Sequence, residues 1–300
     1  MGALFLVSGS GKTVGRIDPE KLRNKEFLSP HIRDPGGWVP LPSVPVSSWI
    51  MSRHSTIELP FTTYLCGSCS STFHVMEKLA REAEVKPWDS VFSLSQWAGI
   101  GQWSRRWISR EGNVHATFVL PAEMSGFPGP LSLVIGFWIT RFLEREEIPA
   151  RIKWPNDIVI QRRKLGGILV RHTLGASFAG VGLNVNSAPM AWELETGDLP
   201  AISLREAGYY ELDPLFLWGK ALEELKRYYQ WEWKAERRNF ISKAESLLEF
   251  RNEVVDVIDG KGVLRRGRIC AVGSNGGLIV AFPTGKEEIL SGRIFCAREE

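Results

Sequence analysis

The segment from residue 150 to residue 170 constrains the fold and the chemistry of this chain more than any other. It contains the motif KWPND, which ends at Asp157, and seven residues later the motif KLGGIL, which begins at Lys164. Apolar β-rich runs flank the Pro-Asn-Asp turn, and a second polar turn precedes Lys164, a pattern that predicts a β-hairpin. Such a hairpin brings a lysine and a carboxylate to one edge of a sheet, where a charged substrate can contact both. The alternative is a surface hairpin with ordinary solvated charges.

The composition is that of an ordinary globular protein. The chain has 300 residues, enough for one large or two modest domains, with 44% hydrophobic and 24% charged residues. A net charge of only +3 gives no electrostatic reason to expect a nucleic-acid or membrane partner. No apolar run approaches the roughly 20 residues of a membrane span, and the first residues lack the basic leader of a signal peptide. Four scattered cysteines do not form a disulfide framework, so we expect a cytoplasmic protein with free thiols.

Composition and periodicity divide the chain into three regions. Repeated prolines predict an irregular extension over residues 1–60, without an N-terminal helix-turn-helix or a repressor role. Residues 61–248 have a mixed α/β character. Residues 249–298 contain four short apolar strands separated by turn residues, which predict a small β-barrel.

The mixed region contains several distinct elements. Helical spacing and cap residues predict helices over 71–84, 130–147, 213–233 and 235–248. Alternation of apolar residues predicts strands over 88–94, 113–120 and 179–186, in addition to the hairpin.

The combination of KWPND with the following KLGGIL closely resembles the signature of biotin protein ligases, which attach biotin to carboxylase carrier domains. The resemblance covers residues 61–298 with the motifs in the expected order. It implies an α+β fold, with a mixed-sheet biotin/lipoate ligase-like catalytic domain over 61–248 and an SH3-like domain over 249–298. It also implies a monofunctional enzyme that lacks the DNA-binding module found in some family members.

The reaction implied by this resemblance joins two anions. The biotin carboxylate attacks the α-phosphate of ATP and expels pyrophosphate, so the site must hold both anions together and neutralise developing charge. In the family, the lysine that matches Lys164 reaches the biotin carboxylate and the α-phosphate. Asp157 has two candidate roles, either holding Mg²⁺ near the phosphates or orienting and deprotonating the carrier lysine. A turn aspartate that caps its own backbone is the alternative.

Residues 95–107 resemble the glycine-rich adenylate loop of the family, with two departures. The family usually has arginine after each of the first two glycines, where this chain has Ile100 and Gln102. Ile100 keeps the backbone N–H that contacts biotin. Gln102 forms hydrogen bonds but carries no charge, and loss of a charge-assisted contact costs about 1–3 kcal/mol. Arg105 matches a basic family position and is expected to compensate, with Arg106 beside it.

The resemblance assigns further residues to the two substrates. Lys164, Asp157 and Arg105 are the expected catalytic residues. The expected biotin contacts are Ser71, Thr72, Gln96, Gly99, Ile100, Lys164 and Gly167. The expected ATP contacts are Gly101, Gln102, Arg105, Arg106, Trp107, Asn156 and Asn184. Where the family usually has Asp and Asn around the Ser-Thr pair, this chain has Ser70 and Phe73.

The implied substrates are biotin and ATP with Mg²⁺, and the implied partner is the biotin carboxyl carrier domain of a carboxylase. A homodimer is possible for this family. Two alternatives remain open. A lipoate or octanoate ligase would need an extended apolar pocket in place of Ser71, Thr72 and Gln96, and a non-catalytic biotin or adenylate binder is suggested by Ile100 and Gln102. The lone Cys66-x-x-Cys69 pair does not predict a zinc or redox site.

Overall fold

The computed structural model describes most of the chain after residue 60. The described residues are 61–127, 130–195, 198–233 and 243–297, together with 4–9, 38–41, 49–54 and positions 13, 22 and 25. The chain divides into two compact units. Unit 1 comprises residues 1–125, 169–188 and 203–223, and unit 2 comprises residues 126–168, 189–202 and 224–300.

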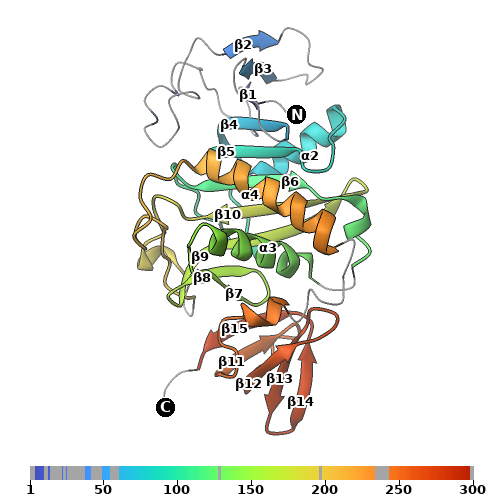
Figure 1. Cartoon of the computed structure of the whole chain (residues 1–300), viewed down its shortest axis with the longest axis vertical. Helices are drawn as coiled ribbons and strands as arrows, with labels where there is room; N and C mark the ends of the chain where they lie inside the picture. The colour runs from blue at the N-terminus through green and yellow to red at the C-terminus, as the bar shows by residue number, and fades with distance from the viewer. Residues whose placement is uncertain are drawn as a thin grey trace. The chain divides into compact units, whose positions relative to one another are not determined.

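Unit 1 contains a mixed sheet whose strands run in the order β2-β3-β1-β4-β5-β6-β10, followed by the end of β9 (Figure 1). β4 pairs in parallel with β1 and β5, whereas β1–β3, β2–β3, β5–β6 and β6–β10 are antiparallel. This confirms the predicted mixed sheet. The strands are β1 (Leu4–Gly9), β2 (Trp38–Leu41), β3 (Trp49–His54), β4 (Thr63–Cys69), β5 (Ser90–Gln96), β6 (Val114–Val119), β9 (Arg163–Thr173) and β10 (Ala176–Leu183).

Three of these strands lie in the region where the prolines predict an irregular extension. β1 is a short apolar run that pairs in parallel with β4, with Leu6 opposite Leu65. β2 contains Pro40 and is the first strand of the sheet order, a position that tolerates the missing N–H. The proline-rich composition therefore does not exclude short strands, of which β1 pairs with strands distant in sequence and β2 with the nearby β3. Apart from positions 13, 22 and 25, the rest of the extension lies outside the described residues.

Helices α2 (Thr72–Glu82) and α4 (Pro214–Tyr228) cover opposite faces of the unit 1 sheet. Every residue of β6 is buried, so its two faces can be followed by alternation. Thr117 bonds to Thr72 at the start of α2, whereas the neighbouring Phe118 packs on Trp218 of α4, with ring centroids 5.7 Å apart. A strand covered on both faces explains why apolar residues occur on both of its faces.

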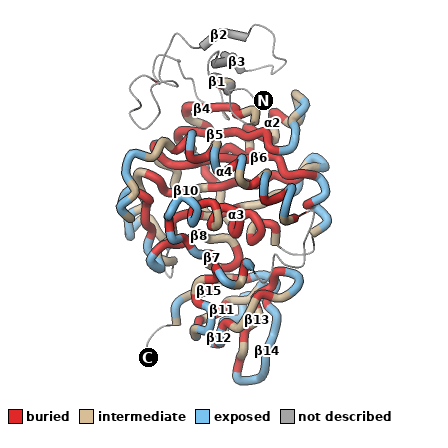
Figure 2. Tube along the Cα trace, in the orientation of Figure 1, coloured by how far each residue is buried: buried red, intermediate tan, exposed pale blue. Residues whose placement is uncertain are grey.

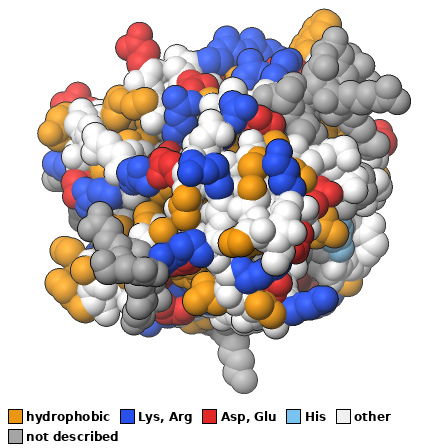
Figure 3. Space-filling view, turned by 90° about the horizontal axis from the view of Figure 1, so that it is seen from below, with side chains coloured by type: hydrophobic (Ala, Val, Ile, Leu, Met, Phe, Trp, Pro, Cys, Tyr) orange, Lys and Arg blue, Asp and Glu red, His pale blue; other side chains and the backbone are white. Residues whose placement is uncertain are grey.

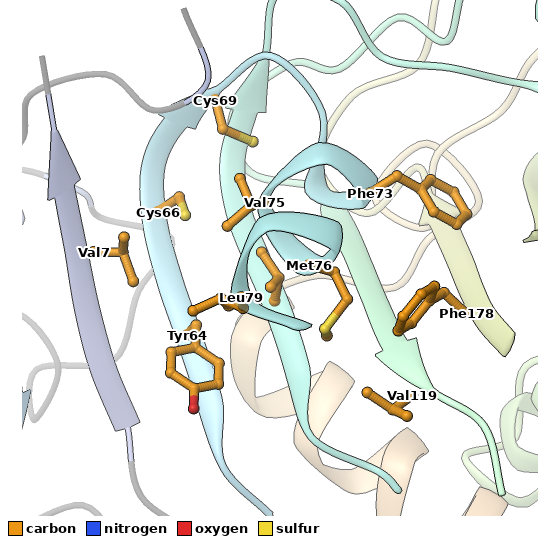
Figure 4. Close-up of a cluster of buried hydrophobic side chains, with 11 residues drawn as sticks. Val7, Tyr64, Cys66, Cys69, Phe73, Val75, Met76, Leu79, Val119 and Phe178 are labelled. Carbon is orange, nitrogen blue, oxygen red and sulfur yellow. The ribbon is translucent and has the colours of Figure 1, made fainter. Parts of the chain in front are cut away.

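The contact between α2 and the sheet forms a buried core (Figure 4). It contains Val7, Tyr64, Cys66, Cys69, Phe73, Val75, Met76, Leu79, Val91, Val119 and Phe178. The two cysteines are fully buried there, and the tube of β4 to β6 is coloured as buried over most of its length (Figure 2). The predicted helix over 71–84 is confirmed, because its apolar residues recur on the face that meets this core.

Unit 2 contains helix α3 (Leu131–Arg145), which packs on β7 (Arg151–Lys153) and β8 (Asp157–Ile160). β8 lies between β7 and the first half of β9, and both pairs are antiparallel. The predicted helix over 130–147 and the predicted hairpin over 150–170 are confirmed, with the second turn of the hairpin at Gln161 and Arg162.

Short helical turns occur in both units. They lie at Gln102–Ser104 and Ala122–Met124 in unit 1 and at Ala191–Glu193 and Tyr229–Trp233 in unit 2.

A second, antiparallel sheet in unit 2 has the strand order β14-β13-β12-β11-β15. Its strands are β11 (Val254–Asp259), β12 (Leu264–Val272), β13 (Leu278–Phe282), β14 (Gly285–Ile289) and β15 (Gly292–Cys296). The predicted C-terminal β domain is confirmed, with five strands rather than four. The boundary near residue 249 stays a prediction, and most of the helix predicted over 235–248 lies outside the described residues, with residues 243–246 helical.

The second sheet contacts the KWPND hairpin within unit 2. The fully buried Trp154 donates its indole N–H to the carbonyl of Gly276, at 3.0 Å, in the turn between β12 and β13. Gly276 has φ of +75°, and a Cβ there would lie 2.9 Å from Cδ of Pro130, just before α3. Only glycine therefore fits this turn.

Charges of both signs are mixed on the surface of the second sheet. Arg265 pairs with Glu287 and Arg266 with Asp256, each at 2.8 Å. Basic side chains are spread over the face in Figure 3 with acidic ones among them. No helix in the described part of the chain is both long and apolar enough to cross a membrane.

Asn113, just before β6, organises the segment that follows β10. Its Oδ1 accepts three backbone N–H groups, from Val185 at 2.8 Å, Asn186 at 3.0 Å and Ser187 at 3.2 Å. Its Nδ2 donates to the Ser187 carbonyl at 2.9 Å, and the side chain is buried. One amide therefore accepts three backbone donors of this turn, and the Asn186 N–H is shared with the Gly112 carbonyl at 3.2 Å.

We expect Asn113→Ala to lower the free energy of unfolding by about 2–4 kcal/mol, because the backbone N–H groups of Val185 and Ser187 lose their acceptor, while that of Asn186 keeps the Gly112 carbonyl. Urea unfolding followed by fluorescence measures this change. Asn113→Asp is the matched control, since it keeps the acceptor oxygen and should lose clearly less. Equal losses in the two variants would show that the acceptor does not hold the turn.

Candidate functional site

Parallel pairing places the ends of β4 and β5 at the same edge of the unit 1 sheet. Cys69 lies opposite Gln96, and the N–H of Trp97 donates to the Cys69 carbonyl at 3.0 Å. Because parallel strands end at a common edge, the residues after β4 lie beside Gln96 although they are distant in sequence.

Four polar side chains form a continuous hydrogen-bond chain at this edge. Gln96 Oε1 accepts from the Thr72 N–H at 2.7 Å and from the Thr72 hydroxyl at 3.2 Å, while its Nε2 donates to the Ser109 hydroxyl at 2.8 Å. The Thr72 hydroxyl also bonds to that of Thr117, at 2.8 Å. These contacts fix the orientation of the Gln96 amide. Ser109 and Thr117 belong to no recognisable motif.

Ser71 is the N-cap of α2. It has extended backbone angles, and its hydroxyl accepts from the Phe73 N–H at 3.3 Å. The neighbouring Ser70 hydroxyl bonds to Nδ1 of His74 at 3.1 Å. Both serines are buried, whereas Gln96 and Ser109 of the polar edge are only half-buried.

The segment from Gly99 to Trp107 is a tight hairpin. The Trp107 N–H donates to the Gly99 carbonyl at 2.9 Å, and the Gly101 N–H donates to the Arg105 carbonyl at 2.8 Å. A Cβ on Gly99 would lie 2.5 Å from the Trp107 carbonyl oxygen, so a larger residue does not fit. Trp103, at the tip, has a positive φ of 60° and is exposed. The loop returns as a hairpin rather than opening a helix, which excludes a Rossmann-type phosphate site.

Two glycines of β10 make room for aromatic rings on one face of the sheet. A Cβ on Gly182 would lie 2.4–2.8 Å from atoms of the Trp107 indole, and a Cβ on Gly180 would lie 2.4 Å from the Phe73 ring. Asn184 follows the strand and is buried. The glycines before Asn184 therefore serve the close packing of these rings.

His115 lies opposite Gly182 and is a further buried polar residue of this part of unit 1. Its Nε2 lies 3.0 Å from the carbonyl of Arg110, which accepts the ring N–H. Burial lowers the pKa of His115 to about 4, so its ring is neutral at physiological pH. It shares a face of β6 with Thr117, two positions away, and nothing in the sequence pattern singles it out.

In unit 2, the carboxylate of Asp157 lies between two lysines. Lys164 Nζ is 2.6 Å from Oδ1, and Lys153 Nζ is 3.1 Å from Oδ2. The side chains of Lys153 and Asp157 are each 13% exposed and that of Lys164 is 27% exposed. Each carboxylate oxygen therefore has its own ammonium partner, and the cluster carries one net positive charge.

A β-bulge brings Lys164 to the face that carries Asp157. Asp157 pairs with Gly167 and Ile158 with Gly166, but Val159 pairs with Lys164, so one residue of β9 is extra. In regular register Lys164 would lie opposite Ile160 and point to the other face. The extra residue, Leu165, is fully buried, and it shifts the lysine by one position.

Residues 200–202 hold the backbone of Lys164 on the other side of β9. The Lys164 N–H donates to the Pro200 carbonyl at 2.7 Å, and the Ile202 N–H donates to the Lys164 carbonyl at 2.9 Å. Asn156 fixes the preceding turn, because its Nδ2 donates to the Ile168 carbonyl at 3.0 Å. The segment 200–202 has no motif, and its contact is long-range, so sequence reasoning does not find it.

The two ammonium groups keep Asp157 ionised. Burial of the carboxyl raises its pKa, but the charges of Lys164 and Lys153 outweigh this effect and lower the pKa to about 2. At physiological pH the group is a carboxylate and a weak base.

No group of three or more His, Cys, Asp or Glu side chains within the described residues is arranged to hold a metal ion. Both oxygens of Asp157 already bond to lysines. These donors do not form a resident metal site, and the role of Asp157 as an Mg²⁺ ligand stays a prediction without geometric support.

The predicted residues fall into two groups. Unit 1 contains Ser71, Thr72, Gln96, Gly99, Ile100, Gly101, Gln102, Arg105, Arg106, Trp107 and Asn184. Unit 2 contains Asn156, Asp157, Lys164 and Gly167. Their functional roles stay predictions.

Comparison with solved structures gives a match over most of the chain. A biotin protein ligase from Aquifex aeolicus, solved in complex with biotin and ATP, is similar with a TM-score of 0.68 and 26% identity. The match covers 79% of this chain and 99% of that chain.

Comparison with curated proteins gives shorter matches. The bifunctional ligase/repressor BirA of Escherichia coli is 32% identical over 192 residues, which cover 61% of this chain and 58% of that protein. A biotin--[acetyl-CoA-carboxylase] ligase of Paracoccus denitrificans is 31% identical over 146 residues, which cover 46% of this chain and 60% of that protein. The chain thus spans less than two thirds of the length of these relatives.

The family model described as the biotin/lipoate A/B protein ligase family matches residues 66–186. That range runs from β4 to the turn after β10, and it includes the polar edge, the glycine-rich hairpin and the Lys-Asp-Lys cluster. The chain therefore contains a domain of the biotin/lipoate A/B protein ligase family, spanning residues 66–186.

Proposed function

We propose that this protein is an ATP-dependent biotin protein ligase. The biotin carboxylate attacks the α-phosphorus of Mg·ATP, which forms biotinyl-AMP and releases pyrophosphate. The ε-amine of a carrier lysine then attacks the acyl carbon, an amide bond forms, and AMP leaves. The observation that carries the proposal is the Lys153–Asp157–Lys164 cluster, because both half-reactions need cations beside anionic reactants.

Lys164 is the proposed catalytic cation. It is the more exposed lysine of the cluster, and its backbone is held by hydrogen bonds to residues 200 and 202. An ammonium held in this way offsets the charge that develops on the α-phosphate without reorganising the backbone. Asp157 is proposed to orient the incoming carrier amine rather than to deprotonate it, since a carboxylate with a pKa of about 2 accepts protons poorly. Mg²⁺ is proposed to arrive with the phosphates of ATP, its usual oxygen ligands.

The polar edge of unit 1 is the proposed site for the ureido ring of biotin. That ring has two N–H donors and one carbonyl acceptor, which suit hydroxyl and amide partners. Thr72 and Gln96 are already held by Ser109 and Thr117, so the site is pre-organised. An octanoyl or lipoyl chain offers no ureido group to this edge, which makes lipoate the informative control.

The glycine-rich hairpin is the proposed cover of the adenylate. Gly101 and Gln102 supply uncharged contacts to the phosphates, Arg105 and Arg106 supply charge, and Trp107 packs on adenine. The proposed acceptor is the biotin carboxyl carrier domain of a carboxylase, and because ATP is a cytoplasmic substrate we place the reaction in the cytoplasm. Asn156 and Asn184 stay proposed ATP contacts.

Biotin-dependent release of pyrophosphate from ATP tests the proposal. We expect release with biotin and not with lipoate, followed by biotin labelling of a carrier domain added afterwards. Release with lipoate alone would favour the lipoate ligase. Biotin binding without pyrophosphate release would favour a non-catalytic binder.

Lys164→Ala should lower the rate of pyrophosphate release at least about a hundredfold, because the cation beside the α-phosphate is lost. Single-turnover formation of the adenylate measures the step directly. Lys261→Ala, which changes an exposed lysine in the turn between β11 and β12, is the matched control and should keep the parent rate. A Lys164→Ala variant with full activity would refute the assigned role.

Gly182→Ala should raise the KM for ATP about tenfold or more and change biotin affinity much less. The added methyl group overlaps the Trp107 indole and displaces the ring from its place on the strand. Gly126→Ala is the control, since a Cβ there meets nothing within 4 Å. An unchanged KM for ATP would separate Trp107 from nucleotide binding.

A further inference from the structure

Lys153 has a place in the cluster that the chemistry assigned to Lys164 does not explain. It lies directly opposite Asp157 in the β7–β8 pair and binds Oδ2, whereas Lys164 binds Oδ1. When Lys164 turns toward an anionic substrate, one oxygen of the carboxylate loses its partner. The other oxygen keeps Lys153.

The exposure of the three side chains distinguishes the two lysines. Lys153 and Asp157 are equally shielded, each 13% exposed, and Lys164 is about twice as exposed, at 27%. Within the described residues, these two lysines are the ion-pair partners of Asp157. Without Lys153, departure of Lys164 would leave a shielded carboxylate with no counter-ion, which is unfavourable. Lys164 would then remain bound to the carboxylate.

The backbone around Lys153 is held on both sides. The Ile152 N–H donates to the Leu247 carbonyl at 2.8 Å, and the Ile152 carbonyl accepts from the Glu249 N–H at 2.7 Å. On the other side, Trp154 is fully buried and bonds to Gly276. The backbone of Lys153 is therefore fixed. A residue that holds another group in place needs such a fixed position.

We propose that Lys153 is a positioning residue of the ligation reaction: it holds Asp157 through Oδ2 so that Lys164 can exchange Oδ1 for the α-phosphate of ATP. This inference rests on the proposed function. Lys153 acts through Asp157 and has no role in biotin recognition. Its loss should therefore lower turnover and leave biotin binding largely unchanged.

Four variants test the inference in the full-length chain: Lys153→Met, Lys153→Arg, Asp157→Asn and the double variant Lys153→Met with Asp157→Asn. Lys153→Met should lower kcat for biotin-dependent pyrophosphate release at least about tenfold, with a biotin KM within about twofold of the parent. Lys153→Arg should recover most of the rate, because it keeps the charge. In the Asp157→Asn background, Lys153→Met should have almost no further effect.

The matched control is Lys78→Met, which removes another lysine from an i,i+4 ion pair, with Glu82 at 3.6 Å on α2. It should keep the parent rate. Urea unfolding of each variant verifies that the rates belong to folded protein, and Lys153→Gln replaces Lys153→Met if the latter does not fold.

The possible outcomes separate the two proposals. A parent chain that releases no pyrophosphate with biotin overturns the proposed function and this inference with it. An active parent whose Lys153→Met variant keeps its kcat overturns the inference alone. If Lys153→Met lowers kcat by the same factor in the Asp157→Asn background, Lys153 does not act through the carboxylate, and the inference is again overturned. A Lys153→Arg variant whose kcat is as low as that of Lys153→Met also overturns the inference.

Discussion

The geometry of the charged cluster depends on a single carboxylate shared by two ammonium groups. Lys153 and Lys164 lie on the two strands that flank β8 and repel each other, and Asp157 of β8 forms an attractive contact with each of them. The result is a fixed cluster with one net positive charge and limited exposure to solvent. Such a cluster suits a reaction of two anions, because the cation is present before the substrate arrives and does not need to be recruited.

The backbone makes this arrangement possible through one extra residue. Without the bulge at Leu165, the sheet register would direct Lys164 to the face opposite Asp157. The same residue is fully buried, so its apolar packing stabilises the irregularity that places the lysine. The hydrogen bonds to residues 200–202 hold the lysine from the other side of the strand. The position of the Lys164 ammonium therefore depends both on local strand geometry and on long-range contacts.

Much of the fold follows from local sequence patterns, and much of the site does not. The helices α2 and α3 and the hairpin over residues 150–170 are predicted because apolar periodicity and turn residues are local signals. The strands before residue 60 escape prediction because they are short and lie in a proline-rich region, and because β1 pairs with strands that are distant in sequence. Ser109, Thr117 and His115 escape for a related reason, since ordinary residues gain a role only when distant strands meet. The bulge cannot be predicted from the sequence of β9 alone, because register depends on how two strands pair.

The departures from the family pattern in the glycine-rich hairpin affect charge more than shape. The hairpin is closed by backbone hydrogen bonds between Gly99 and Trp107 and between Gly101 and Arg105, and these do not depend on the side chains at positions 100 and 102. Ile100 therefore keeps its N–H in the same backbone frame. Gln102 removes a cation from that frame, which under the proposed function lowers the stabilisation of the phosphates by about 1–3 kcal/mol. We therefore expect Gln102 to affect the reaction rate and the retention of the adenylate, whereas the class of reaction depends on the lysine cluster.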